Sequence, residues 1–351
     1  MKFLRHLVVL FAVYLSILPV TGQVPAYYSS INFSQSGLPL KNDLANLIIS
    51  THTSPVTYDD VWTILQLSDL DPSNSAKVLL AYGYDDTDGS IFNDRTRTKT
   101  NYGGSSGQWN REHTFAKSLG NPDLGTSGPG SDAHNLRASD VDMNNMRGNL
   151  LFADGSGDAG SVGANWYPGD EWKGDCARII MYMYLRYSLQ CRPYYCAVGT
   201  VNSVDANMVN VLLDWNAEDP VSQLEETRND VIQSYQGNRN PFIDNPYIAT
   251  RIWGGTPAED TWGGLNTEEN REAMLTVFPS PAYEHEIYIT MSGQLELISI
   301  ELVSTTGQKV ETYTIENTEN STWHLTNVPS GYYIIQLQTA DMVYTKKLVV
   351  L

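Results

Sequence analysis

The stretch Gln108-Trp109-Asn110-Arg111-Glu112-His113 places an acid and an imidazole next to each other, directly after a long irregular region. Residues 84–107, which precede it, are rich in Gly, Asp, Ser, Thr and Asn, a composition that predicts a loop with short strands. Adjacent side chains on an extended segment point to opposite faces. Glu112 and His113 can therefore serve one site only if the segment ends or bends there.

Two polar runs follow within some forty residues, Asp132-Ala133-His134-Asn135-Leu136-Arg137 and Asn144-Asn145-Met146-Arg147-Gly148-Asn149. Together with Glu112 and His113 they supply a base, oxygen ligands for a hard cation, and guanidinium groups for a phosphate, the set that phosphodiester hydrolysis needs. Each group also has an ordinary structural interpretation: a surface acid, a hydrogen-bonded histidine, a helix C-cap and two solvated arginines. Spacing alone leaves both interpretations open.

Apolar residues at helical spacing surround this region and predict a mainly helical α+β domain over residues 24–255. The predicted helices cover residues 42–50, 58–67, 139–150, 175–189, 207–217 and 220–236. Ser139 is expected to cap the third, and Gly237 to end the last. Residues 73–81 fit a strand or a helix, and residues 154–170 resemble a loop.

The composition changes near Gly254. Residues 256–272 fit a linker, and alternation over residues 287–290, 295–302 and 332–337 then predicts short strands. We expect a small β-sandwich over residues 273–351.

Lys2 and Arg5, followed by an apolar run over residues 7–20, predict a secretory signal peptide at residues 1–23 in preference to a membrane anchor. We expect no stable membrane span.

The secretory route permits disulfides. Cys191 and Cys196 flank a segment that can turn, so a bridge and two free thiols are both open, whereas Cys176 on an apolar helical pattern is expected to be a buried free thiol.

A net charge of −18 argues against binding a polyanion. Around the polar runs the balance reverses, because residues 95–150 contain seven Lys and Arg against five Asp and Glu. Affinity for nucleic acid is therefore expected to be modest and steeply salt-dependent.

Asn110-Arg111-Glu112-His113, residues 132–140 and Arg147-Gly148-Asn149 resemble the bacterial endonuclease I family of periplasmic and secreted nucleases with a ββα-metal (His-Me finger) site. Similar runs continue at residues 173–178, 218–222 and 236–244, so the resemblance covers about residues 55–253. It departs from the family at Ala116 and Ala138, where proline is frequent, which removes local rigidity but no chemical group.

The resemblance implies a role for each residue. His113 resembles the general base. Glu112 and Asn149 resemble the ligands of one Mg²⁺, which Mn²⁺ or Ca²⁺ can replace. Arg137 and Arg147 are predicted as catalytic residues that hold the phosphate or product.

Other motif residues are expected to support the fold. His134 is assigned a structural or supporting role, and residues 237–244 a hydrogen-bonded turn beside the site. Lys173 and Arg178 fit contacts with DNA or solvated surface equally well.

The tail resembles the C-terminal sorting domain of the Bacteroidota type IX secretion system at residues 277–282, 304–310, 330–333 and 346–351. We prefer sorting to a carbohydrate- or surface-binding sandwich because the sequence indicates no exposed aromatic cluster. The resemblance implies export through the periplasm and release or surface anchoring by the type IX machinery.

The sequence therefore predicts a secreted or cell-surface, monomeric endonuclease that acts on DNA and RNA without sequence specificity. Two alternatives remain: a metal-dependent phosphodiesterase for another substrate such as a phospholipid, and an inactive binding module.

Overall fold

The computed structural model describes residues 24–265, 275–283, 285–291, 297–304, 307–314, 322–339 and 343–351. The predicted signal peptide and residues 266–272 of the predicted linker lie outside the described residues. Within the described ranges, no helix combines the length and the apolar character needed to cross a bilayer.

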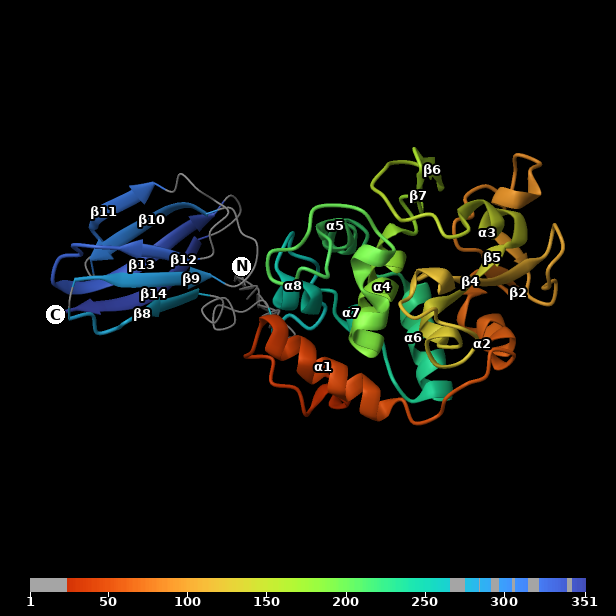
Figure 1. The fold of residues 1–351 in the computed structure, drawn as a ribbon, viewed down its shortest axis with the longest axis horizontal. Coiled ribbons are helices and arrows are strands. Elements are labelled where there is room, and N and C mark those ends of the chain that lie inside the picture. The colour runs from red at the N-terminus through yellow and green to blue at the C-terminus, as the bar shows by residue number, and fades with distance from the viewer. Residues whose placement is uncertain are drawn as a thin grey trace, which may run out of the picture.

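Helices dominate the first part of the chain (Figure 1). They are α1 (Gly37–Thr51), α2 (Asp60–Ser68), α3 (Val141–Arg147), α4 (Lys173–Tyr187), α5 (Asn210–Glu218), α6 (Gln223–Gln236), α7 (Pro241–Asp244) and α8 (Tyr247–Trp253). Short 3₁₀ turns lie at Ala26–Tyr28, Ile91–Asn93, Lys117–Leu119, Gly128–Gly130, Ala133–Asn135, Ser188–Cys191 and Pro193–Tyr195. Helix α4 is central, because residues 174–185 are all buried and it packs against α1, α5 and α7.

Most of the predicted helices are confirmed within a few residues, because they bury apolar side chains in this core or in the smaller apolar clusters beside it. Gly237 ends α6 in the left-handed region, with φ of 90°. Residues 73–81, for which the sequence allowed a strand or a helix, contain a strand at Asn74–Leu79.

Short strands form three small sheets in the same domain. Strands β1 (Leu70–Asp71), β2 (Asn74–Leu79) and β3 (Thr96–Thr98) make one sheet, and β6 (Gly160–Val162) and β7 (Asn165–Tyr167) make a hairpin within the region expected to be a loop. Strands β4 (Trp109–His113) and β5 (Leu136–Asp140) pair antiparallel, with Glu112 opposite Arg137. Strand β4 ends at His113, as the shared site requires.

Helix α3 begins later than predicted. Ser139 does not cap it but lies in β5, where its Oγ donates to the Ala81 carbonyl at 3.1 Å. Asp140 is the cap, since its Oδ1 accepts from the backbone N–H of Asp142 at 2.7 Å and of Met143 at 3.0 Å. The helix ends before Gly148, whose φ of 53° stops it two residues short of Asn149.

Residues 256–265 are not a linker, contrary to the prediction from their composition. Trp262 is only 7% exposed, and its ring lies 5.2 Å from Tyr28 and 5.5 Å from Phe33. Leu265 is also buried in the core of the helical domain. Burial of the Trp262 ring fixes this segment to the helical domain, although the residues around it are rich in Gly and Thr.

The C-terminal part contains strands in two sheets. One has the order β12-β9-β8 and the other the order β11-β10-β13-β14. Their bounds are β8 (Leu275–Phe278), β9 (Ile287–Met291), β10 (Leu297–Ser304), β11 (Lys309–Thr314), β12 (Thr322–Leu325), β13 (Gly331–Thr339) and β14 (Val343–Val350). Both sheets contribute to one apolar core, with Ile289 from the first and Ile300 and Ile335 from the second.

The tail does present an exposed aromatic row, so the expectation that it has none is wrong. Phe278, Tyr288 and His324 lie on neighbouring strands, with ring centroids 5.6 Å and 4.3 Å apart in that order. Phe278 is 45% exposed and Tyr288 37% exposed. Of the three, only Tyr288 belongs to a strand predicted from alternation, and that prediction did not say which face is exposed.

All three cysteines are buried and free. Cys176 therefore matches its prediction, and of the two possibilities left open for Cys191 and Cys196 the structure shows free thiols. Burial raises the pKa of each thiol well above its usual value.

Candidate active site

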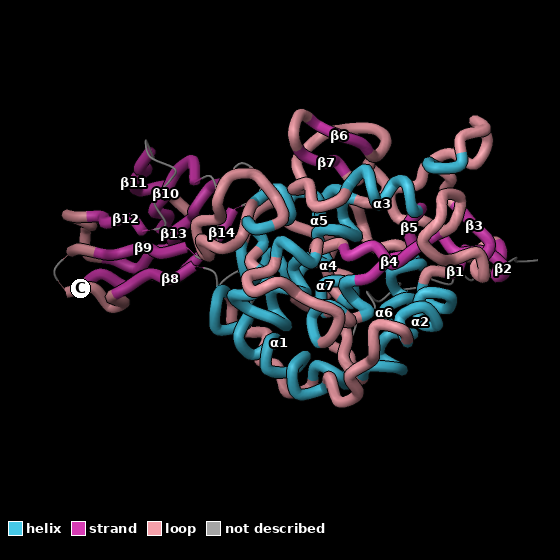
Figure 2. Tube along the Cα trace, turned by 45° about the vertical axis from the view of Figure 1, so that its right-hand side comes forward, coloured by secondary structure: helices cyan, strands magenta, loops and turns pink. Residues whose placement is uncertain are grey.

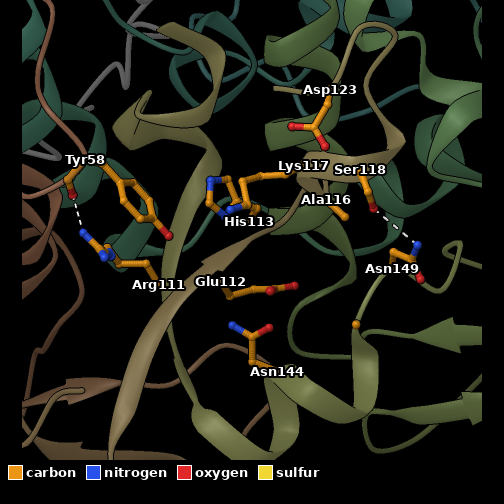
Figure 3. A pocket seen from close by; sticks show the side chains of 11 residues that line it. Tyr58, Arg111, Glu112, His113, Ala116, Lys117, Ser118, Asp123, Asn144 and Asn149 are labelled. Carbon is orange, nitrogen blue, oxygen red and sulfur yellow. Dashed lines mark hydrogen bonds between the residues drawn. The ribbon is translucent and has the colours of Figure 1, made fainter. Parts of the chain in front are cut away.

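A pocket of about 520 Å³ opens at the end of β4. Figure 2 shows β4 and β5 with α3 on one side and α2 on the other. Helix α3 and the turn that precedes α2 each contribute a side chain to the pocket. Its lining is polar and mixed in charge (Figure 3): Tyr58, Arg111, Glu112, His113, Ala116, Lys117, Ser118, Asp123, Asn144, Gly148 and Asn149. The structure thus brings together His113, Glu112 and Asn149 from the predicted set.

His113 is held in a single orientation. Its Nε2 lies 2.9 Å from the Gly130 carbonyl oxygen, and its ring stacks on Tyr58 with centroids 5.6 Å apart. A carbonyl only accepts hydrogen bonds, so Nε2 carries the proton and Nδ1 keeps the basic lone pair.

His113 is neutral at physiological pH. Burial lowers its pKa from 6.5 to about 4, and the nearby charges of Lys117 and Arg111 act in the same direction. The hydrogen bond to Gly130 opposes this shift without cancelling it. An imidazole that is buried and unprotonated at neutral pH is ready to accept a proton.

Glu112 is 2% exposed and fixed by two partners. Its Oε1 accepts a hydrogen bond from the Tyr82 hydroxyl at 2.9 Å and lies 3.1 Å from Arg147 Nη1. Neither contact uses Oε2. Burial raises the pKa of Glu112, while the charge of Arg147 opposes that shift.

Two asparagines line the pocket in different places. Asn144 lies in α3 beside Glu112 in Figure 3, and its Nδ2 donates to Asn110 Oδ1 at 2.7 Å. Asn149 lies beyond the end of α3, is exposed, and donates from Nδ2 to Ser118 Oγ at 3.3 Å. The sequence pattern pointed to Asn149 and not to Asn144, although both belong to the run from Asn144 to Asn149.

The oxygen donors beside β4 fit a magnesium ion. Mg²⁺ prefers hard oxygen ligands and is often bound by one or two protein groups, with waters and substrate completing its shell. Glu112 and Asn144 offer one carboxylate and one carboxamide oxygen from neighbouring elements. Across the described part of the chain, no cluster of three or more His, Cys, Asp or Glu residues suited to a metal is found, so a site here depends on water or substrate for its other ligands.

Arg137 does not line the pocket, contrary to its predicted contact with phosphate. It is 2% exposed, with Nη1 2.5 Å from Asp175 Oδ2 and Nε 3.3 Å from Asp69 Oδ2. Asp69 also pairs with Arg228. The guanidinium joins β5 to the core and is not available to a substrate.

Arg147 is also buried, with 0% exposure, and does not line the pocket. Besides Glu112, it donates to the carbonyl oxygens of His113 at 3.0 Å and Thr114 at 2.7 Å. Arg147 therefore fixes both the metal-ligand candidate and the end of β4. Arg147 thus holds other residues of the site in place and does not make the predicted contact with phosphate.

The cations that line the pocket are Arg111 and Lys117. The Arg111 guanidinium lies 3.5 Å from the centroid of the Tyr58 ring, and Lys117 Nζ lies 5.9 Å from it. Neither residue had a role predicted from the sequence. Their closeness to the Glu-His pair in the sequence could have indicated one, because Arg111 directly precedes the pair and Lys117 follows it by four residues.

The remaining motif residues lie away from the pocket. His134 is buried, its ring is 4.4 Å from that of Tyr182, and its Nε2 is 3.3 Å from the Asn238 carbonyl, as a structural role predicts. Residues 237–244 form hydrogen bonds as expected, with Asn240 capping α7, but none of them lines the pocket.

Arg178 is neither solvated nor available to DNA. It is fully buried and pairs with Glu225 at 2.6 Å. Lys173 pairs with Glu218 at 2.5 Å.

Comparison with known proteins identifies both parts of the chain. The family model for endonuclease I matches residues 36–247, and that for the secretion system C-terminal sorting domain matches residues 276–351. An extracellular ribonuclease of Bacillus amyloliquefaciens is 38% identical over 253 residues, which cover 68% of this chain and 81% of that protein. An extracellular ribonuclease of Bacillus subtilis (strain 168) is 40% identical over 242 residues, covering 65% and 78%. Among solved structures, an engineered protein aligns over 57% of this chain and 48% of its own at 13% identity, with a TM-score of 0.18.

Proposed function

Since this chain belongs to the endonuclease I family and ends in a C-terminal sorting domain, it is a secreted or cell-surface nuclease, and we propose that it hydrolyses DNA and RNA without sequence specificity. Two extracellular ribonucleases among its relatives support RNA as a substrate. The sorting domain supports export by the type IX machinery. The single observation that carries the chemistry is the neutral, anchored imidazole of His113 beside Glu112 in one pocket.

His113 acts as the general base in this proposal. Its Nδ1 takes a proton from a water molecule as the water oxygen bonds to phosphorus. The bond between phosphorus and the 3′ oxygen breaks, and the departing oxygen takes a proton from solvent water, which leaves a 5′-phosphate on one product and a 3′-hydroxyl on the other. The bond from Nε2 to Gly130 keeps Nδ1 directed at the pocket throughout.

We propose that Glu112 and Asn144 hold one Mg²⁺, and that Mn²⁺ or Ca²⁺ can replace it. When bound, the cation offsets negative charge on the phosphate and on the leaving oxygen. Arg147 keeps the Glu112 carboxylate in place through its 3.1 Å contact. Asn149, the ligand expected from the sequence, is the alternative to Asn144, and metal-binding measurements on the two variants separate them.

Arg111 and Lys117 hold the substrate phosphates in place of the buried Arg137 and Arg147. Both line the pocket, and the ammonium of Lys117 can move with its flexible stem. In a chain of net charge −18, two local cations give weak, salt-sensitive attraction.

The arrangement of β4, β5 and α3 supports the ββα-metal fold expected from the sequence: two antiparallel strands present the base and one ligand, and the following helix presents the other. The two C-terminal sheets around one core support the β-sandwich expected for the tail.

The test is digestion of supercoiled plasmid and of single-stranded RNA with Mg²⁺, with and without EDTA. Wild type is expected to cut both, and EDTA to stop the reaction. His113→Ala should lose about 10²–10⁴-fold in rate, which is the usual contribution of a general base. His324→Ala, an exposed histidine of the tail, is the matched control and should cut like wild type.

Two results would contradict the proposal. A wild-type protein that cuts no nucleic acid with any of the three metals is not the enzyme proposed. A His113→Ala variant that cuts as fast as wild type refutes the assignment of the base. A phospholipid substrate tested in parallel covers the other phosphodiesterase class.

A further inference from the structure

One face of β4 carries a row of side chains that leads away from the catalytic pocket. Trp109, Arg111 and His113 alternate along the strand and so share a face. Tyr58, in the turn before α2, and Trp62, within α2, lie against this face. The ring and guanidinium contacts between the two sets place their side chains in layers.

The layers form a continuous stack. Tyr58 lies on His113 at an interplanar angle of 26°. The Arg111 guanidinium is 3.5 Å from the centroid of the Tyr58 ring and 4.0 Å from that of Trp62. Trp62 then stacks on Tyr102, with centroids 4.8 Å apart and planes at 27°. We call Tyr58, Arg111, Trp62 and Tyr102 the aromatic stack.

The far end of the aromatic stack is open to solvent and rigidly held. Tyr102 is 38% exposed, whereas Trp109 beneath it is fully buried and supplies the contact with the core. Two backbone hydrogen bonds close the loop around Tyr102: Gly103 N–H to the Trp109 carbonyl at 2.9 Å, and Trp109 N–H to the Asn101 carbonyl at 3.1 Å. A fixed, flat, exposed ring loses little conformational freedom when another ring stacks on it.

We propose that the aromatic stack is a subsite for unpaired nucleic-acid bases beside the catalytic pocket, which makes single strands the preferred substrate. This inference rests on the proposed nuclease function. Aromatic side chains bind any unstacked base through its flat face, and bases within a duplex do not offer that face. The stack includes the charge of Arg111, which also lines the pocket, so a strand held on the stack continues toward the groups that cut it.

The test measures binding separately from cleavage. The full chain carrying His113→Ala is titrated in EDTA against a fluorescent single strand of about twelve nucleotides, and binding is followed by anisotropy. Adding Tyr102→Ala should raise Kd roughly tenfold, since stacking of one base contributes about 1–3 kcal/mol. Tyr102→Leu keeps apolar volume over Trp62 and should weaken binding similarly, while Tyr102→Phe should restore it. Tyr194→Ala removes a tyrosine that is 37% exposed elsewhere and should leave Kd unchanged.

A Tyr102→Leu variant that is folded and binds the single strand as tightly as its parent overturns the proposal. So does equal weakening for a fully paired duplex of the same length, or equal weakening by Tyr194→Ala. Failure of the nuclease function is a separate result, because it shows as absence of cleavage by the chain with His113 intact. In that chain, Tyr102→Leu should lower the ratio of kcat/KM for the oligonucleotide to kcat/KM for a small diester such as bis(p-nitrophenyl) phosphate.

Discussion

Arg137→Met tests whether this arginine holds the core together or holds the substrate. The side chain is 2% exposed, and its loss leaves two buried carboxylates with fewer partners. Asp69 keeps Arg228 and the N–H of Ala138 at 2.7 Å, but Asp175 keeps only Arg178 at 3.7 Å. Removing one partner of a buried ion pair costs about 3–5 kcal/mol, so the free energy of unfolding should fall by that amount. Methionine keeps the apolar stem beside Trp172.

The loss should grow with pH. Burial, with the charge of Glu225, already raises the pKa of Asp175 from 3.8 to about 7, and removal of Arg137 raises it further. A carboxyl group whose pKa is raised in the folded state contributes stability that is fully present below its unfolded pKa and is lost as pH rises from there to the folded pKa. The destabilisation should therefore lie near the lower end of the range at pH 6 and near the upper end at pH 8.

The assay is urea unfolding followed by tryptophan fluorescence at both pH values. The control is Arg95→Met, which removes the exposed pair with Glu171 and should cost no more than about 1 kcal/mol. The reasoning is refuted if Arg137→Met stays within about 1 kcal/mol of wild type while KM for nucleic acid rises strongly. That outcome would restore the predicted contact with phosphate.

Three further perturbations address the metal site, acid stability and the domain boundary. Asn144→Ala should weaken Mn²⁺ binding, measured by calorimetry, at least tenfold, while Asn149→Ala should change it little; the reverse order would assign the ligand to Asn149. Burial lowers the pKa of His134 from 6.5 to about 4, so the neutral form favours the folded state above pH 6.5, and this stabilisation is lost as pH falls toward 4. His134→Gln should reduce the acid-induced loss by about 3 kcal/mol, and an unchanged slope of stability against pH would contradict this. Trp262→Ala should cost about 3–5 kcal/mol in urea unfolding, whereas a negligible change would support a linker at this position.

Sequence periodicity predicted most helices because each buries a continuous apolar stripe. The same argument could not place Asn144. Three asparagines lie within six residues, and only the start of α3, set by the Asp140 cap, decides which one faces Glu112. A shift of two residues in the start of a helix turns its side chains by half a turn.

The buried arginines were mispredicted because their partners are distant in sequence. Arg137 meets Asp69, 68 residues earlier, and nothing local to either residue indicates the pair. An arginine in a catalytic motif is normally expected to face the substrate, whereas here the fold uses two of them internally. His113 and Glu112 line one pocket, as the sequence predicted, because their placement depends only on where a single strand ends.

The contact of Trp262 with Tyr28 and Phe33 joins the two ends of the helical domain. Any cleavage that removes the C-terminal sheets must therefore leave Trp262 and Leu265 on the product, or the remaining chain loses part of its core. Packing then sets a lower limit on the length of a stable product, wherever the chain is cut. We expect the smallest stable secreted form to begin no later than Tyr27 and to end no earlier than Leu265.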